Sequence, residues 1–248
     1  MPAETPVLTA DRFVAELTER QSDEELRKIG RYFKSGEGDY GEGDRFLGVR
    51  MGDVFTLAKE FIDMPPDEIE ELLESSLHEV RSGACSIMGK SAARKRTPDD
   101  RRRALYDLYL RRLDRVNNWD LVDLAARDVV GRWLADHPGN DTPTDVLGDL
   151  ARSDDVWARR TAIVATAAFQ QRGELDETYR IAEILMADDH DLIHKAVGGW
   201  VRNAGKSDRD RLLAFLDEHA ATMPRTMLRY ASEHLDADQR AHYRGLSL

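Results

Sequence analysis

The sequence of 248 residues contains a single cysteine, and this scarcity limits both its chemistry and its environment. Cys85 has no second cysteine with which to form an internal disulfide, and a zinc site built from cysteines is excluded. A reducing cytoplasm is therefore the expected location.

Long apolar runs and strand patterns are also missing. No uncharged apolar stretch is long enough for a transmembrane helix, and the first residues lack the basic and apolar regions of a signal peptide. No segment alternates apolar and polar residues as a strand does. We therefore expect a helical protein without a membrane partner.

The composition is that of a soluble globular protein, with 41% hydrophobic and 33% charged residues. The formal net charge of −11 argues against indiscriminate binding of nucleic acid. It does not exclude a basic patch on one face, because net charge does not describe how charge is distributed.

Helical periodicity runs through nearly the whole sequence, and short turns separate the segments. The strongest break, residues 137–143, is interpreted as a turn between helices because periodicity resumes directly after it. This pattern predicts an all-α fold of stacked antiparallel helix pairs in a single domain, residues 1–248. The expected helices include residues 10–20, 22–33, 53–62, 66–73, 76–93, 156–164, 174–186, 191–204, 207–220 and 224–235.

The segment 116–127 is the most informative part of the chain. Asn117 or Asn118 can cap a helix, and Trp119 and Asp123, four residues apart, then share one face. An aromatic plane beside a carboxylate suits a cationic ligand or a developing positive charge. The alternative is an ion pair between Asp123 and Arg127, with Trp119 covering the core.

Two further segments carry basic residues in unusual places. Arg160 lies on or beside a buried stripe, where it needs a carboxylate or phosphate partner. In the segment 191–204, Trp200 falls on the expected core stripe. A separate basic face carries Lys195, Arg202 and Lys206, with Gly199 in its middle, where a backbone can approach closely.

Several motifs, in order along the chain, together resemble the DNA alkylation repair glycosylases of the HEAT-like helical-repeat type. They are residues 31–34, 46–50, 78–81, 118–123, 157–164, 195–202 and 223–230. The resemblance implies a C-shaped HEAT-like solenoid whose concave basic face grips duplex DNA as a monomer. It also implies hydrolysis of the N-glycosidic bond of N3- and N7-alkylated purines without metal or cofactor.

The resemblance also assigns residues. The family's Trp-x-x-x-Asp pair falls on Trp119 and Asp123, and its site arginine falls on Arg160. Asp123 is then expected to stabilise the oxocarbenium-like sugar, Trp119 to pack on the lesion nucleotide, and Arg160 to hold a phosphate. The residues expected to contact DNA are Tyr32, Lys34, Arg159, Lys195, Gly199, Trp200, Arg202 and Lys206.

One position departs from the family pattern. Gly199 occupies the place of the family's second site tryptophan, and Trp200 lies one residue later. Either the second aromatic wall is missing or a local shift of the helix restores it. The alternative function is a non-catalytic helical-repeat protein that binds damaged or branched DNA, and a protein-binding scaffold is a third possibility.

Overall fold

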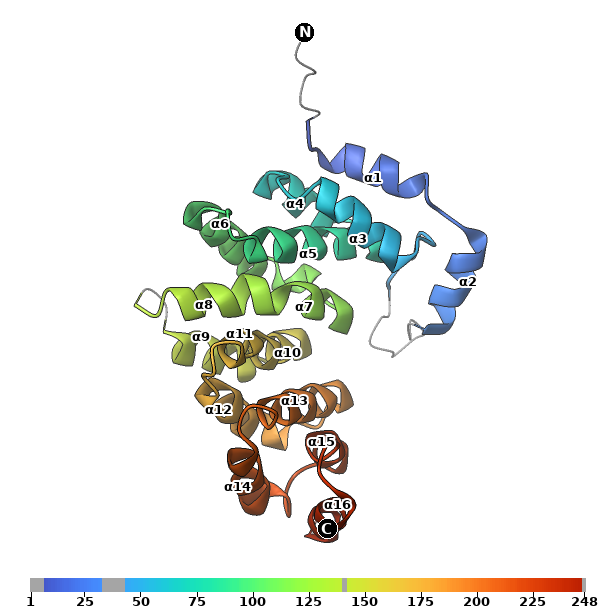
Figure 1. Ribbon diagram of the computed structural model, residues 1–248. Coiled ribbons are helices and arrows are strands. Elements are labelled where there is room, and N and C mark those ends of the chain that lie inside the picture. Colours follow the sequence, from blue (N-terminus) through green and yellow to red (C-terminus); the bar gives the residue numbers. More distant parts are fainter. Residues whose placement is uncertain (1–6, 33–42, 140–141, 247–248) are drawn as a thin grey trace. The chain divides into compact units, whose positions relative to one another are not determined.

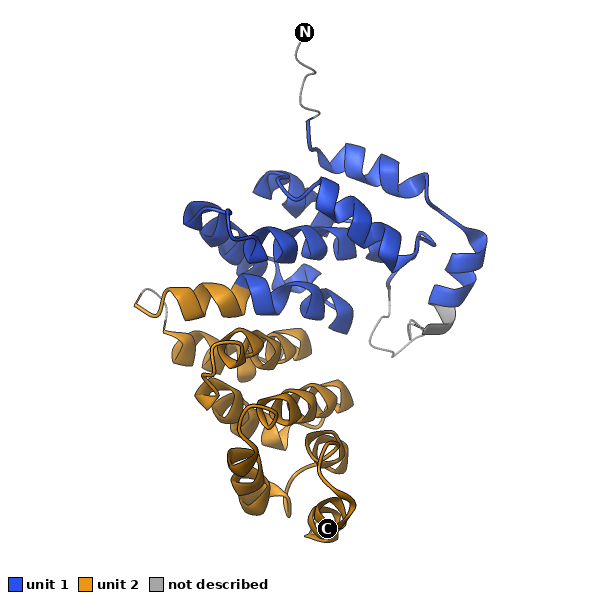
Figure 2. Ribbon diagram, in the orientation of Figure 1, with its two compact units in different colours: residues 1–129 blue, residues 130–248 orange. Residues whose placement is uncertain are grey.

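The computed structural model describes residues 7–32, 43–139 and 142–246, and the regular elements in these ranges are helices (Figure 1). An isolated β-bridge between Arg45 and Leu77 is the one extended pairing among the described residues. The predicted all-α fold is confirmed. The chain divides into two compact units, residues 1–129 and 130–248, which Figure 2 colours separately.

Unit 1 is built around a central helix, α5 (His78–Ala93), which packs against its neighbours α3, α4 and α7. Small residues fill much of α5 and nearly all its side chains are buried, so helices can pack on several of its sides. The other elements are α1 (Ala10–Thr18), α2 (Asp23–Tyr32), α3 (Met51–Glu60), α4 (Pro66–Leu73), α6 (Asp99–Arg111), η1 (Leu113–Arg115) and α7 (Trp119–Ala126).

Gly89 sets how closely α5 and α7 approach. A Cβ atom at this position would lie 2.3 Å from the backbone oxygen of Leu124, closer than a side chain permits. Only glycine therefore allows the observed packing. After α7 the chain passes through one π-helical turn, η2 (Arg127–Gly131), an irregularity that often accompanies functional sites.

Unit 2 contains the remaining helices. They are α8 (Arg132–Asp136), α9 (Pro143–Ala151), α10 (Val156–Ala165), α11 (Ala167–Gln170), α12 (Asp176–Ile184), η3 (Leu185–Ala187), α13 (Asp191–Ala204), α14 (Arg209–His219), α15 (Arg225–Ala231) and α16 (Ala237–Leu246). Helix α13 packs on α10 and α15, and Ile193, Val197 and Val201 form its fully buried stripe.

The predicted helices agree with the structure to within a few residues, and Pro66–Leu73 and Asp191–Ala204 agree at both ends. The expected break falls between α8, which ends at Asp136, and α9, which begins at Pro143. The last expected helix was wrong in its extent, because α15 ends at Ala231 and a separate helix, α16, follows. The single domain and the C-shaped solenoid stay predictions.

Candidate active site

A cavity of about 630 Å³ opens in unit 1 against the first turns of α7. Its apolar lining comes from α2, α3, the segment before α3, and α7. Trp119 adds an aromatic plane to this lining. The other apolar residues are Ile29, Val49, Met51, Phe55 and Leu124.

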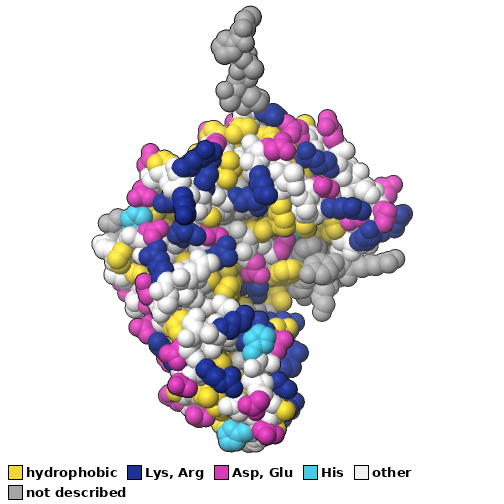
Figure 3. Space-filling view, in the orientation of Figure 1, with side chains coloured by type: hydrophobic (Ala, Val, Ile, Leu, Met, Phe, Trp, Pro, Cys, Tyr) yellow, Lys and Arg dark blue, Asp and Glu magenta, His cyan; other side chains and the backbone are white. Residues whose placement is uncertain are grey.

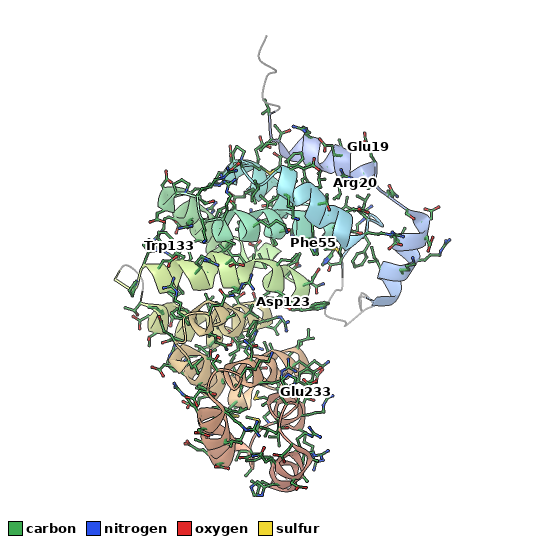
Figure 4. The ribbon with its side chains drawn as sticks, in the orientation of Figure 1. Glu19, Arg20, Phe55, Asp123, Trp133 and Glu233 are labelled. Carbon is green, nitrogen blue, oxygen red and sulfur yellow. The ribbon has the colours of Figure 1, made fainter. Side chains whose placement is uncertain are left out.

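The start of α7 presents its polar side chains to this cavity. Asn118 is the N-cap, and its side-chain oxygen accepts a hydrogen bond from the Trp119 backbone N–H at 2.8 Å. Trp119, Asp120 and Asp123 then line the cavity, and Asp123 is solvent-exposed. Figure 4 labels Asp123 on α7 and Phe55 on α3. The predicted sharing of one face by Trp119 and Asp123 is confirmed.

The predicted alternative paired Asp123 with Arg127. In the structure, the Arg127 guanidinium places Nε and Nη2 at 3.0 and 2.5 Å from the Asp128 carboxylate, so these two donors serve a different acid. Trp119 is only partly buried, so it does not simply cover the core. An exposed carboxylate beside a partly exposed aromatic ring can attract a flat cationic group.

The opposite wall of the cavity carries both signs of charge. Glu25 of α2 lies 2.8 Å from the Lys28 ammonium and 3.2 Å from Arg50. Hydrogen bonds with Glu24 and Glu25 raise the pKa of Lys28, so its amine is held protonated. A protonated amine is a poor nucleophile.

Behind α7 lies a buried ionic cluster of Asp44, His78, Arg81 and Asp120. His78 Nε2 lies 2.7 Å from Asp120 Oδ2, and Nδ1 lies 3.3 Å from Asp44 Oδ2. Arg81 also pairs with Asp44. Burial lowers the pKa of His78, but hydrogen bonds to Asp120 and Asp44 outweigh it and raise the pKa to about 9. His78 is therefore an imidazolium at neutral pH.

Glu79, the next residue, fixes another wall of the cavity. Its fully buried carboxylate accepts hydrogen bonds from the backbone N–H groups of Leu47 and Gly48 at 2.9 Å and of Val49 at 3.4 Å. Gly48 has φ +88°, which a residue with a side chain rarely adopts. This turn carries Val49 and Arg50 to the cavity.

A second cavity, of about 270 Å³, lies within unit 2. Arg160 of α10 is buried there, with 8% of its surface exposed, and Nη1 donates to the Leu192 carbonyl at 3.1 Å. Gly199 also lines this cavity, and a Cβ placed on it meets no atom within 4 Å. The other lining residues are Lys195, Ala196, Trp200, Arg202, Asn203 and Tyr230.

Helix α13 is a continuous α-helix over Asp191–Ala204, so Gly199 and Trp200 hold their regular helical positions. Whether the second aromatic wall is missing stays a prediction. The expectation that Trp200 lies on the buried stripe was wrong. Trp200 is half-buried and lines the same cavity as Gly199, because it lies next to that residue on the open side of the helix.

The other predicted DNA contacts differ in their surroundings. Lys195 pairs with Asp191 at 2.6 Å and Arg202 pairs with Glu233, which Figure 4 labels. Arg159 donates to the buried Asp188 and to two loop carbonyls, contacts typical of a structural role. Lys206 is exposed in the turn after α13, the side chain of Tyr32 is not described, and Lys34 lies outside the described residues. These contacts with DNA stay predictions.

A third cavity, of about 280 Å³, lies between α15 and α16 and was not expected. Arg225, Arg229 and Arg244 line it, and none of them pairs with a carboxylate among the described residues. Arg229 lies over the Tyr230 ring at 4.8 Å, and Arg244 Nε donates to the Arg240 carbonyl. In Figure 3, basic side chains gather along the edge of unit 2 near α13 and α15.

The sequence interpretation missed His78, Asp120, Phe55 and these arginines. His78 and Glu79 stood in the quoted motif at 78–81, and two acid–base residues at the start of a helix were a usable signal. Among the described residues, no group of His, Cys, Asp and Glu is arranged to hold a metal ion. No described helix is long and apolar enough to cross a membrane.

The fold and the cavity define an all-helical protein that presents an aromatic–carboxylate pair from a single helix. Residues 13–235 match the family model described as DNA alkylation repair enzyme, so the chain belongs to this family. Its fold is similar to a solved structure described as a predicted DNA alkylation repair enzyme from Enterococcus faecalis. The TM-score is 0.68 and the identity 17%, over 88% of this chain and 98% of that one. No curated protein matches the sequence.

Proposed function

We propose that this protein is a monofunctional DNA glycosylase that removes cationic N3- and N7-alkylated purines from duplex DNA. The observation that carries the proposal is the pairing of Trp119 and Asp123 at the mouth of a largely apolar cavity. Membership of the family supports a role in the repair of DNA alkylation damage.

The chemistry requires little from the protein. When the bond between C1′ and the purine nitrogen breaks, its electron pair neutralises the positive base, which leaves without being protonated. The sugar is left as an oxocarbenium-like cation, which the Asp123 carboxylate stabilises. Water then bonds to C1′ and releases a proton to the carboxylate or to solvent. The products are the free base and an abasic site.

The monofunctional assignment rests on the lysine in the cavity. A lyase step needs an unprotonated amine that forms a Schiff base with the sugar. Lys28 lies within hydrogen-bond distance of both Glu24 and Glu25, at 2.7 and 2.8 Å, so its amine is protonated. We therefore expect borohydride to trap no covalent complex with DNA.

The test is release of free 7-methylguanine and 3-methyladenine from methylated duplex DNA. We expect Asp123→Asn to slow excision by about a hundredfold or more, and to leave duplex affinity largely unchanged. An equal loss of affinity and excision would contradict the catalytic assignment. Arg127→Gln, in the π-helical turn directly after α7, serves as the control, because its guanidinium is engaged by Asp128.

The second candidate is a protein that binds damaged or branched DNA without excising a base. Gly199 favours it, because this position carries no side chain where the family's tryptophan is expected, although Trp200 and Tyr230 line the same cavity. Wild-type protein that binds duplex DNA and releases no base would support this candidate.

A further inference from the structure

His78 is the one histidine of unit 1, and it is buried directly behind the helix that carries Trp119 and Asp123. Only 1% of its surface is exposed, and the proposed chemistry does not use it. Both ring nitrogens face carboxylates, Asp44 on one side and Asp120 on the other.

The cluster holds the start of α7 at two points. His78 binds Asp120, which lies in the first turn. Asp44 accepts a hydrogen bond from the Asn118 amide at 3.0 Å, and Asn118 in turn caps the helix at Trp119. One buried ionic cluster therefore anchors both the N-cap and the first turn of the helix with the aromatic–carboxylate pair.

We propose that the charged form of His78 is a positioning element for this pair: together with Asp44 it fixes the first turn of α7, and thereby the direction in which Trp119 and Asp123 face the cavity. This inference rests on the proposed function. His78 does not touch the substrate and acts through Asp120 and Asp44.

The charge of His78 matters because each ring nitrogen lies against a carboxylate. In the imidazolium, Nε2 donates a hydrogen bond to Asp120, and Nδ1 carries its proton to within 3.3 Å of Asp44, where it forms an ion pair without hydrogen-bond geometry. Neutral imidazole has one N–H, so loss of the proton leaves either Asp44 or Asp120 facing a nitrogen lone pair. It also leaves two buried carboxylates with one cation, Arg81, where the cluster was balanced. An uncompensated buried charge is costly, so the start of α7 must rearrange.

The groups facing His78 come from each element packed around it. The segment before α3 contributes Asp44 and the Phe46 ring, whose centroid is 5.3 Å from the imidazole centroid. Helix α7 contributes Asp120, and α5 itself contributes Arg81. Cys85 of α5 is fully buried. Burial is the main cause that raises the pKa of its thiol, and the negative charge of the nearby Asp120 raises it further, so the thiol stays neutral. His78 is thus the group of this cluster that titrates on the alkaline side of neutrality.

The experiment compares wild-type protein with His78→Gln and Asp120→Asn in single-turnover excision from pH 6.5 to 10.5, with duplex affinity measured alongside. Glutamine keeps a donor but cannot carry the charge. At pH 7 we expect His78→Gln to slow excision by about tenfold or more with affinity within about threefold of wild type. Dividing the wild-type rate by the His78→Gln rate at each pH removes the pH dependence of the substrate. This ratio should fall toward about one as His78 loses its proton.

Asp120→Asn is the second arm, because it keeps the size of the side chain and removes one of the two attracting charges. It should move the alkaline midpoint of the wild-type profile to lower pH. His137→Gln is the matched control, since His137 lies in unit 2 stacked on Trp133 at 3.7 Å. Its profile should follow that of wild type. A His78→Gln rate equal to wild type at pH 7, or a constant rate ratio over the whole range, overturns the inference.

Backbone hydrogen exchange separates this inference from the proposed function. In His78→Gln at pH 7, the first-turn amides of α7 should exchange faster, while those of α13 in unit 2 should not change. If wild type releases no base but His78→Gln speeds the exchange of the α7 amides, the glycosylase proposal is refuted and the positioning role is kept. Wild type that excises, with α7 exchange unaffected by His78→Gln, refutes the positioning role alone.

Discussion

Gly199 faces open space in the cavity that also contains the buried Arg160, at the position where the family's second tryptophan is expected. We predict that Gly199→Trp is accepted by the fold and increases excision of alkylated purines by about fivefold, because an aromatic face near a cation contributes about 1 kcal/mol. Excision kinetics and thermal unfolding measure both effects.

Gly139→Trp is the control for this change. Gly139 also meets no atom within 4 Å of a placed Cβ, and it lies after α8 and lines neither the Arg160 cavity nor the cavity between α15 and α16. If both variants change excision equally, the aromatic wall is not the cause.

The buried His78 also makes stability depend on pH. Its pKa is raised from 6.5 to about 9, so its contribution is fully present below pH 6.5 and is lost as the pH rises through 9. Urea unfolding at pH 7 and pH 10 should show wild type losing up to about 3 kcal/mol more than His78→Gln. Equal losses in both proteins would assign the alkaline sensitivity to other groups.

At the scale of single residues, the sequence predicted the arrangements that local spacing determines. Trp119 and Asp123 share a face because they are four residues apart on one helix, and periodicity is sufficient to see it. The cluster of Asp44, His78 and Asp120 joins positions 34 and 42 residues apart. Such contacts depend on how helices pack, which periodicity does not describe.

Helix α5 positions α7 through a close contact at Gly89. We predict that Gly89→Ala destabilises the protein by about 1–3 kcal/mol and slows excision, because the added Cβ would lie 2.3 Å from the Leu124 backbone oxygen and must push α7 away. Chemical unfolding and single-turnover excision measure the two effects.

Gly52→Ala, on α3, is the matched variant. Its Cβ meets nothing within 4 Å, so the higher helix propensity of alanine should leave the protein as stable or slightly more stable. A Gly89→Ala protein as stable as Gly52→Ala would mean that the two helices can separate without cost.

Most helices could be predicted from the sequence because hydrophobic periodicity and capping residues indicate the same segments. Asp155 is the N-cap of α10, and its carboxylate accepts a hydrogen bond from the Trp157 backbone N–H at 3.0 Å. The start of α16 was not predicted, because the expected helix was extended past Ala231 to the last apolar residue of its stripe, Leu235. Ser232 to Asp236 form the turn between α15 and α16.

The whole molecule combines a net charge of −11 with a proposed DNA substrate, so the distribution of its cations decides where DNA can bind. Many arginines are neutralised locally: in unit 2, Arg180 pairs with Glu177 and Arg211 with Asp176. The three arginines between α15 and α16, Arg225, Arg229 and Arg244, have no such acidic partner among the described residues.

We therefore predict that replacing Arg225, Arg229 and Arg244 with alanine weakens duplex binding and reduces the slope of log affinity against log salt by roughly 2–3, because each phosphate contact releases about 0.9 counterion. The control variant replaces Arg180, Arg209 and Arg211 with alanine. Of these, Arg211 lies 2.6 Å from Asp176. Both triple variants have the same net charge. A general effect of charge would weaken binding equally in both. A loss confined to the first variant places DNA phosphates at the cavity between α15 and α16, since of the two variants this one removes the cations that have no acidic partner among the described residues.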